Sequence, residues 1–81
     1  MSERARERTQ GSYTVRLLDD QNHRLKKLGE ETVELVAALA TADGERAVEE
    51  AADLVYHVLV ALQAEGVGVP DLLAELGRRE R

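Results

Sequence analysis

Two long apolar runs with helical spacing constrain this chain more than any other feature of its sequence. Leucine, valine and alanine recur near the 3.6-residue period over residues 22–42 and again over residues 45–65. Between the runs lies Asp43-Gly44, a dipeptide typical of a turn. A connection this short favours an antiparallel helical hairpin. We therefore expect two long helices that pack side by side.

Shorter elements flank this hairpin. Ser12 suits the N-cap of a short helix over SYTVRLLDD, and Asn22 suits the N-cap of the first long helix. Gly66 ends the second long helix, and Pro70 fits the first turn of a last helix. Residues 1–11 are charged, so we expect a flexible arm there. The prediction is an all-α fold of two long antiparallel helices and two short ones, with a single domain over residues 12–81.

The helical period also predicts which apolar side chains face inward. Leu54 and Val58 widen the inward stripe of the second long helix, which indicates burial against more than one partner. The remaining residues expected to be buried are Leu25, Leu28, Leu35, Val36, Leu39, Val48, Val55, Leu59, Leu62, Leu72, Leu73 and Leu76.

The chain is small for a stable monomer. It has 81 residues and no cysteine, phenylalanine or tryptophan, so its small apolar side chains bury little area and no disulfide adds stability. We expect a homodimer or a higher homo-oligomer. The net charge of −5 disfavours nucleic acid as a partner. Neither a secretory signal nor an apolar run of roughly 20 residues is present, so a cytoplasmic protein without a membrane partner is expected.

Carboxylates interrupt both apolar runs at matching depth. At roughly 100° per residue, Glu30, Glu31 and Glu34 fan across one face of the first long helix. Glu50 and Asp53 share a face of the second. Glu34 lies about nine residues before the turn and Asp53 about nine residues after it. In a hairpin, Glu31, Glu34, Glu50 and Asp53 can therefore converge in one small volume.

Four converging carboxylates require either protonation or a neutralising cation. Ligation by oxygen alone favours Mg²⁺, Mn²⁺ or Ca²⁺ over Zn²⁺. Hydrated Mg²⁺ is suited to hold a polyphosphate and to supply an activated water. The alternative is a solvated acidic face whose glutamates pair with Lys and Arg one turn away.

Several sequence segments resemble one enzyme family. These segments are GSYTVRLL, KKLGEETVELVAA, EAADLVYHVLVAL and GVGVPDLLAEL. They are similar to the phosphoribosyl-ATP pyrophosphohydrolases of histidine biosynthesis, which belong to the MazG-like all-α nucleoside triphosphate pyrophosphohydrolases. The ExxE and ExxD pairs are shared with that whole superfamily, whereas SYT, KKxGEE and EAADLxYHxLV point to the phosphoribosyl-ATP branch. The resemblance extends from Ser12 to about Glu75 and implies a MazG-like helical bundle that oligomerisation completes.

The resemblance implies a hydrolase that cleaves the α–β phosphoanhydride of phosphoribosyl-ATP, giving phosphoribosyl-AMP and pyrophosphate. The implied cofactor is Mg²⁺, with Mn²⁺ as a substitute. By position, the metal ligands would be Glu31, Glu34, Glu50 and Asp53. Glu30 would act with Glu31 and Glu34 in catalysis, as a ligand of a second metal ion or as the group that orients the attacking water. Such catalysis rests on positioning and on charge neutralisation of the phosphates.

The resemblance also implies contacts with the substrate from basic residues. Lys27 and Lys26 would face the phosphates, with Arg24 as a weaker candidate. The alternative for both lysines is solvation at the start of a helix.

The SYT and YH segments carry the remaining candidates. Ser12, Tyr13 and Thr14 would bind substrate or form a wall of the site; the alternative is an N-cap followed by a packed ring. We interpret Tyr56 and His57 as core or interface residues whose polar tips have hydrogen-bond partners. The alternative for His57 is an acid or a partner of a metal ligand.

The sequence differs from the usual family pattern at two places, and two alternative functions stay open. Family members usually carry a longer helix before the SYT segment, where this chain has a charged segment of only 11 residues, and the usual glycine is missing from Gln21-Asn22-His23. One alternative function is a MazG-like pyrophosphatase of canonical or damaged nucleoside triphosphates. The other is a non-catalytic helical dimerisation module with an acidic surface, which predicts no stabilisation by a metal ion.

Overall fold

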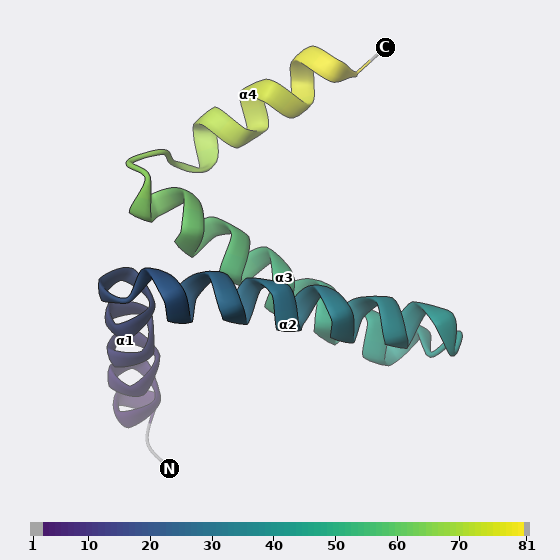
Figure 1. Cartoon of the computed structure of the whole chain (residues 1–81), viewed down its shortest axis with the longest axis horizontal. Coiled ribbons are helices and arrows are strands. Elements are labelled where there is room, and N and C mark those ends of the chain that lie inside the picture. The colour runs from purple at the N-terminus through teal and green to yellow at the C-terminus, as the bar shows by residue number, and fades with distance from the viewer. Residues whose placement is uncertain (1–2, 81) are drawn as a thin grey trace.

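Residues 3–80 fold as four helices, as the computed structural model shows (Figure 1). The model describes the backbone of residues 3–80 and the side chains of residues 11–80. The helices are α1 (Glu3–Asp19), α2 (Gln21–Ala40), α3 (Gly44–Ala64) and α4 (Val69–Arg79). Over residues 3–80 there is no strand, so the predicted all-α fold is confirmed.

The long helices α2 and α3 form the predicted antiparallel hairpin. They form the main helix pair of the described chain. In Figure 1, α3 crosses behind α2 and diverges from it toward α4. The turn contains Ala42 in the left-handed region, at φ 56°, and the amide of Asp43 donates to the carbonyl of Ala38 at 3.1 Å. The Asp43 side chain then caps α3 by accepting from the amide of Arg46 at 3.1 Å. These local bonds bring the two helices together at a fixed register.

Helix α1 differs from the expectation at both ends. It begins at Glu3, so residues 3–11 of the predicted arm are helical, and residues 1–2 lie outside the described part. Ser12 is therefore inside a helix and not at its N-cap. The N-cap of α2 is Asp20 and not Asn22, because the Asp20 carboxylate accepts from the amide of His23 at 3.1 Å. A single interior glycine, Gly11, costs only about 1 kcal/mol and does not end the helix.

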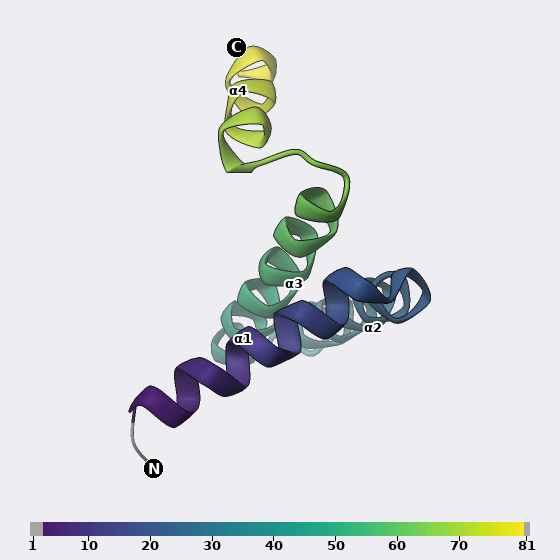
Figure 2. The ribbon, with the colours of Figure 1, turned by 90° about the vertical axis from the view of Figure 1, so that its left-hand side faces the viewer.

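The last helix stands apart from the hairpin. Gly66 ends α3 in the left-handed region, at φ 79°, and the Gly68 amide donates to Asp71 at 2.9 Å where α4 begins. Pro70 lies in the first turn of α4, as predicted. From there α4 points away from α2 and α3 (Figures 1 and 2).

The buried apolar core of the described side chains is small and consists of Leu17, Ala38 and Val60. Much of the predicted inward stripe is wrong for this single chain. More than half of the side-chain surface is exposed at Leu25, Val36, Leu39, Val48, Val55, Leu73 and Leu76. Periodicity identifies an apolar face, but a hairpin of two helices can cover only part of each face.

Helix length and composition were compared with what a membrane span needs. No single helix of the described chain is long and apolar enough to cross a bilayer. Helices α3 and α4 meet the requirement only when taken together, across a bend of 111°.

Candidate active site

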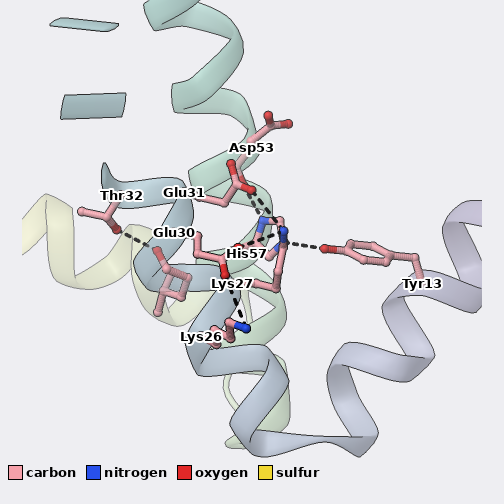
Figure 3. A network of polar contacts seen from close by, with 9 residues as sticks. Tyr13, Lys26, Lys27, Glu30, Glu31, Thr32, Asp53 and His57 are labelled. Carbon is pink, nitrogen blue, oxygen red and sulfur yellow. Dashed lines mark hydrogen bonds and ion pairs between the residues drawn. The ribbon is translucent and has the colours of Figure 1, made fainter. Parts of the chain in front are cut away.

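Three carboxylates from two helices meet in the α2–α3 hairpin. Glu31 projects from α2, and Glu50 and Asp53 project from α3, each offering one oxygen within 4.8 Å of the others. Glu31 is buried, Glu50 is half-buried and Asp53 is exposed, so the cluster extends from the helix interface to solvent. Figure 3 shows Glu31 and Asp53 next to each other at this place. The convergence expected from the register of the hairpin is confirmed.

Glu34 joins this cluster from the next turn of α2. Its carboxyl lies within hydrogen-bonding reach of both Glu31 and Glu50, although Glu34 itself is exposed. The structure thus brings together all four residues expected to hold a metal ion.

The environment of the cluster disfavours the ionised carboxylates. Burial raises the pKa of Glu31 above its usual range, and the hydrogen bond to and charge of Glu34 raise it further. Burial and Glu34 raise the pKa of Glu50 in the same way. Arg46, whose Nε lies 3.8 Å from Glu50, lowers the Glu50 pKa only in part. Lys27 Nζ lies 3.8 Å from Glu31. The free protein therefore holds more negative charge here than its own cations neutralise.

Two buried oxygens of the cluster have no protein partner. Glu31 Oε2 and Glu50 Oε2 are inaccessible to solvent and accept no hydrogen bond from the described residues. Buried carboxylate oxygens are normally paired, since an unpaired one costs free energy. An oxygen-only donor set with two free buried acceptors fits a hard divalent cation such as Mg²⁺ or Mn²⁺. The burial of Glu31 also argues against a merely solvated acidic face.

The remaining acidic and basic candidates lie beside the cluster and not within it. Glu30 is exposed and pairs with Lys27 at 3.3 Å and with Lys26 at 4.0 Å. Lys26 is largely exposed, whereas Lys27 is 28% exposed and reaches both Glu30 and Glu31. Its hydrogen bond to Glu30 raises the pKa of Lys27. Of the two lysine candidates, Lys27 is thus the one that contacts the cluster, whereas Glu30 and Lys26 face solvent.

His57 connects the cluster to α1. It is buried, with Nδ1 2.8 Å from the backbone carbonyl of Asp53 and Nε2 3.0 Å from the hydroxyl of Tyr13 (Figure 3). The interpretation of His57 as a core residue with satisfied polar tips is confirmed. Burial raises the pKa of Tyr13, against the charge of Lys27, which lowers it.

Other residues of the SYT segment hold α1 against α3. The Thr14 hydroxyl is hydrogen-bonded to the Tyr56 hydroxyl, and the Tyr13 and Tyr56 rings stack with their centroids 6.2 Å apart. Ser12 is exposed on α1. Tyr13 and Thr14 therefore belong to a packed wall beside the cluster.

Arg24 has a structural role in place of the phosphate contact considered for it. It is buried, and its Nη1 donates to the carbonyls of Leu17 and Leu18 at 3.1 and 3.0 Å. A cation at the carbonyl end of a helix satisfies free acceptors and complements the helix dipole. Arg24 thus fixes the end of α1 to α2. The feature of the sequence that could have indicated this role is an arginine one turn after a helix break.

Comparison with known proteins decides the family. The family model described as phosphoribosyl-ATP pyrophosphohydrolase matches residues 1–80. The chain belongs to this family. A phosphoribosyl-ATP pyrophosphatase of Pyrobaculum neutrophilum is 50% identical over 96% of this chain and 84% of the relative. One of Methanoculleus marisnigri is 44% identical over 100% of this chain and 87% of the relative.

The family match also extends beyond the segments recognised in the sequence. It includes the residues before Ser12, in agreement with an α1 that begins at Glu3. The histidine biosynthesis bifunctional protein HisIE of Xanthomonas axonopodis pv. citri is 42% identical over 100% of this chain but only 40% of its own length. No solved structure matches the chain.

Proposed function

We propose that this chain hydrolyses phosphoribosyl-ATP to phosphoribosyl-AMP and pyrophosphate in histidine biosynthesis, with Mg²⁺ or Mn²⁺ held by its carboxylate cluster. Membership of the family supports the reaction. One structural observation supports the metal site: oxygens of Glu31, Glu50 and Asp53 lie within 4.8 Å of one another, and two buried oxygens of the cluster accept no hydrogen bond from the described residues.

The metal-binding roles follow from the position of each carboxylate. Glu31 and Glu50 would supply the buried ligands, Asp53 the ligand at the solvent edge and Glu34 a fourth from the next turn. A bound divalent ion would neutralise the phosphates of the substrate and lower the pKa of a coordinated water. Glu31 and Glu34 would keep an attacking water in place as carboxylate acceptors. Glu30 is exposed and would reach this water or a second ion only after its ion pairs with Lys26 and Lys27 break.

The substrate would approach from the solvent edge of the cluster. Lys27 lies at this edge, so its ammonium can turn from Glu31 to a phosphate once a cation neutralises the carboxylates. Lys26 would add a more distant positive charge. From α1, Ser12 would contact the substrate, while Tyr13 and Thr14 would form the packed wall of the site.

The exposed apolar face of the hairpin supports a homo-oligomer. Val33, Val36 and Leu39 on α2 and Val48 and Val55 on α3 each expose more than half of their surface. Contiguous exposed apolar residues of this kind usually mark an interface. A second copy of the chain would cover them and supply the missing core. A cytoplasmic location, without nucleic-acid or membrane partners, stays a prediction.

The deciding experiment is pyrophosphate release from phosphoribosyl-ATP, measured with and without Mg²⁺. The proposal predicts turnover that requires the metal and exceeds turnover of canonical nucleoside triphosphates. Preferential turnover of canonical triphosphates would instead support the broader MazG-like activity. A chain that turns over neither substrate and gains no stability from Mg²⁺ would be the non-catalytic dimerisation module.

A further inference from the structure

His57 contacts both α1 and the backbone of a proposed metal-binding turn. Its ring is buried between α1 and α3, 6% exposed, and both nitrogens are hydrogen-bonded. Nδ1 lies 2.8 Å from the Asp53 carbonyl, one turn earlier in α3. Nε2 lies 3.0 Å from the Tyr13 hydroxyl, on another helix.

The partners of His57 fix the direction of both hydrogen bonds in the neutral ring. A backbone carbonyl can only accept, so Nδ1 carries the proton and donates to Asp53. Nε2 is then an acceptor, and the Tyr13 hydroxyl donates to it. The Tyr13 oxygen keeps its lone pairs for a donor on its other side. The charge of Lys27 acts on Tyr13 more strongly than that of Arg16, whose guanidinium lies 5.6 Å from the centre of the Tyr13 ring, and Lys27 also reaches Glu31.

We propose that His57 is a positioning residue of the carboxylate site. With one nitrogen it holds the turn that presents Asp53. With the other it holds Tyr13 of α1, whose oxygen would then accept from the Lys27 ammonium and direct it to the phosphates. Figure 3 shows this order of side chains, with Tyr13 reaching from α1 to His57 beside Glu31 and Lys27. The inference rests on the proposed function: its effect on turnover needs the proposed reaction, whereas its effect on Mn²⁺ binding needs only the proposed metal site.

A neighbouring hydrogen bond provides the control for mere packing. Thr14 and Tyr56 also join α1 to α3 through side-chain hydroxyls, one residue along each helix from Tyr13 and His57. If the His57 network only attached α1 to α3, loss of the Tyr56 hydroxyl would have the same consequence as loss of the Tyr13 hydroxyl. Tyr56→Phe and Tyr13→Phe both keep the stacked rings and remove one hydroxyl each.

Two substitutions at His57 separate its two contacts. Asparagine places an amide N–H near the position of Nδ1, so His57→Asn keeps the bond to Asp53 and loses Tyr13. Glutamine places an amide oxygen near the position of Nε2, so His57→Gln keeps Tyr13 and loses Asp53. For each full-length variant we would measure the Kd for Mn²⁺ by titration without substrate, and kcat and KM for pyrophosphate release at saturating Mn²⁺.

The proposal predicts opposite results for the two variants. His57→Asn keeps the Kd for Mn²⁺ within about two-fold and lowers kcat/KM roughly ten-fold, as Tyr13→Phe does, and the two changes together lower it no further. His57→Gln weakens Mn²⁺ binding at least about ten-fold and retains most of kcat/KM at saturating Mn²⁺. Tyr56→Phe changes both quantities less than about two-fold.

Two results would overturn the proposal. One is an equal effect of His57→Asn and His57→Gln on the Kd for Mn²⁺. The other is a loss of kcat/KM in Tyr56→Phe as large as in Tyr13→Phe. Tyr13→Phe retains the buried ring, so it tests the Tyr13 contact even where a His57 variant does not fold. If the wild type releases no pyrophosphate, the proposed function fails, while the comparison of Mn²⁺ binding still decides the contact with Asp53.

Discussion

Glu31 and Glu50 meet across the α2–α3 hairpin, and each buries one carboxylate oxygen that accepts no hydrogen bond from the described residues. Their pKa values are raised because both are withdrawn from water and lie next to Glu34. This pair shows that the hairpin contains a local excess of negative charge at its centre. This excess of charge should destabilise the metal-free protein, and a bound cation should relieve it.

Removal of the Glu34 charge should lower activity without lowering stability. In Glu34→Gln we expect turnover to fall at least about 100-fold, because a metal ligand and acceptor for the attacking water is lost. The melting temperature of the metal-free protein should stay constant or rise by a few degrees, because one repelling charge is gone.

Glu75→Gln is the matched control for this substitution. Glu75 pairs with Arg78 and Arg79, and these hydrogen bonds lower its pKa. The negative charge of Glu75 therefore stabilises the folded protein, in contrast to that of Glu34. We expect its removal to leave turnover unchanged and not to raise the melting temperature. Full activity in Glu34→Gln would refute the assigned role of Glu34.

The stability of the metal-free protein should increase as the pH falls from 7 to about 5. The pKa values of Glu31 and Glu50 are raised in the folded protein above the ordinary value of 4.5. In that interval the folded state binds more protons than the unfolded chain, so the free energy of unfolding falls as the pH rises through the folded pKa values. Thermal melts in a chelator would measure this slope.

The double variant Glu31→Gln, Glu50→Gln should lose this dependence, since neither side chain then titrates. Glu75 contributes with the opposite sign, because its lowered pKa makes its contribution disappear only as the pH falls below 4.5. The difference between the wild type and the double variant over pH 5 to 7 therefore reports the contribution of the cluster. A wild-type melting temperature that decreases as the pH is lowered from 7 to 5 would contradict the raised pKa values.

The turn between α2 and α3 offers a stabilising substitution remote from the cluster. Ala42 has a φ of 56°, where a Cβ atom is unfavourable, and it is exposed. Ala42→Gly should raise the free energy of unfolding by about 0.5–1 kcal/mol without changing turnover. Denaturant unfolding would measure it. The control is Ala37→Gly, at an exposed position in the middle of α2, which should lower the free energy of unfolding by about 1 kcal/mol. If Ala42→Gly also lowered this free energy, the turn at Ala42 would not be strained.

The exposed apolar face should carry the self-association. Val48 is 71% exposed in the single chain, so Val48→Glu costs little within it. A charge at a buried interface between copies should shift the protein to monomer, as light scattering coupled to size-exclusion chromatography would show. Val48→Leu, which stays apolar, should not. An unchanged oligomer in Val48→Glu would place the interface elsewhere.

Local signals in the sequence were sufficient for the hairpin and its acidic centre. The Asp43-Gly44 turn is short, and Glu34 and Asp53 are nearly equidistant from it, so helix geometry alone sets them at one level. The start of α1 could not be predicted in the same way, because the weak penalty of Gly11 is outweighed by its helical neighbours. The choice of Asp20 over Asn22 as N-cap depends on where α1 ends, and this is set by Arg24 binding the α1 carbonyls.

The sequence could not show what covers the apolar residues. Val36, Leu39 and Val55 recur at the helical period whether their partner is a helix of the same chain or of another copy. The role of His57 was hidden for a related reason. Its two partners lie on different helices, and only the packing of α1 onto α3 brings Tyr13 within reach of Nε2.

Thermal unfolding at pH 7 with and without Mg²⁺ tests the central claim most directly. If Glu31, Glu34, Glu50 and Asp53 hold a divalent ion, Mg²⁺ or Mn²⁺ at ten times its Kd should raise the melting temperature by roughly 5–10 °C through mass action. The increase should vanish in Glu31→Gln, Glu50→Gln. A wild-type melting temperature that no concentration of either ion changes would contradict the account.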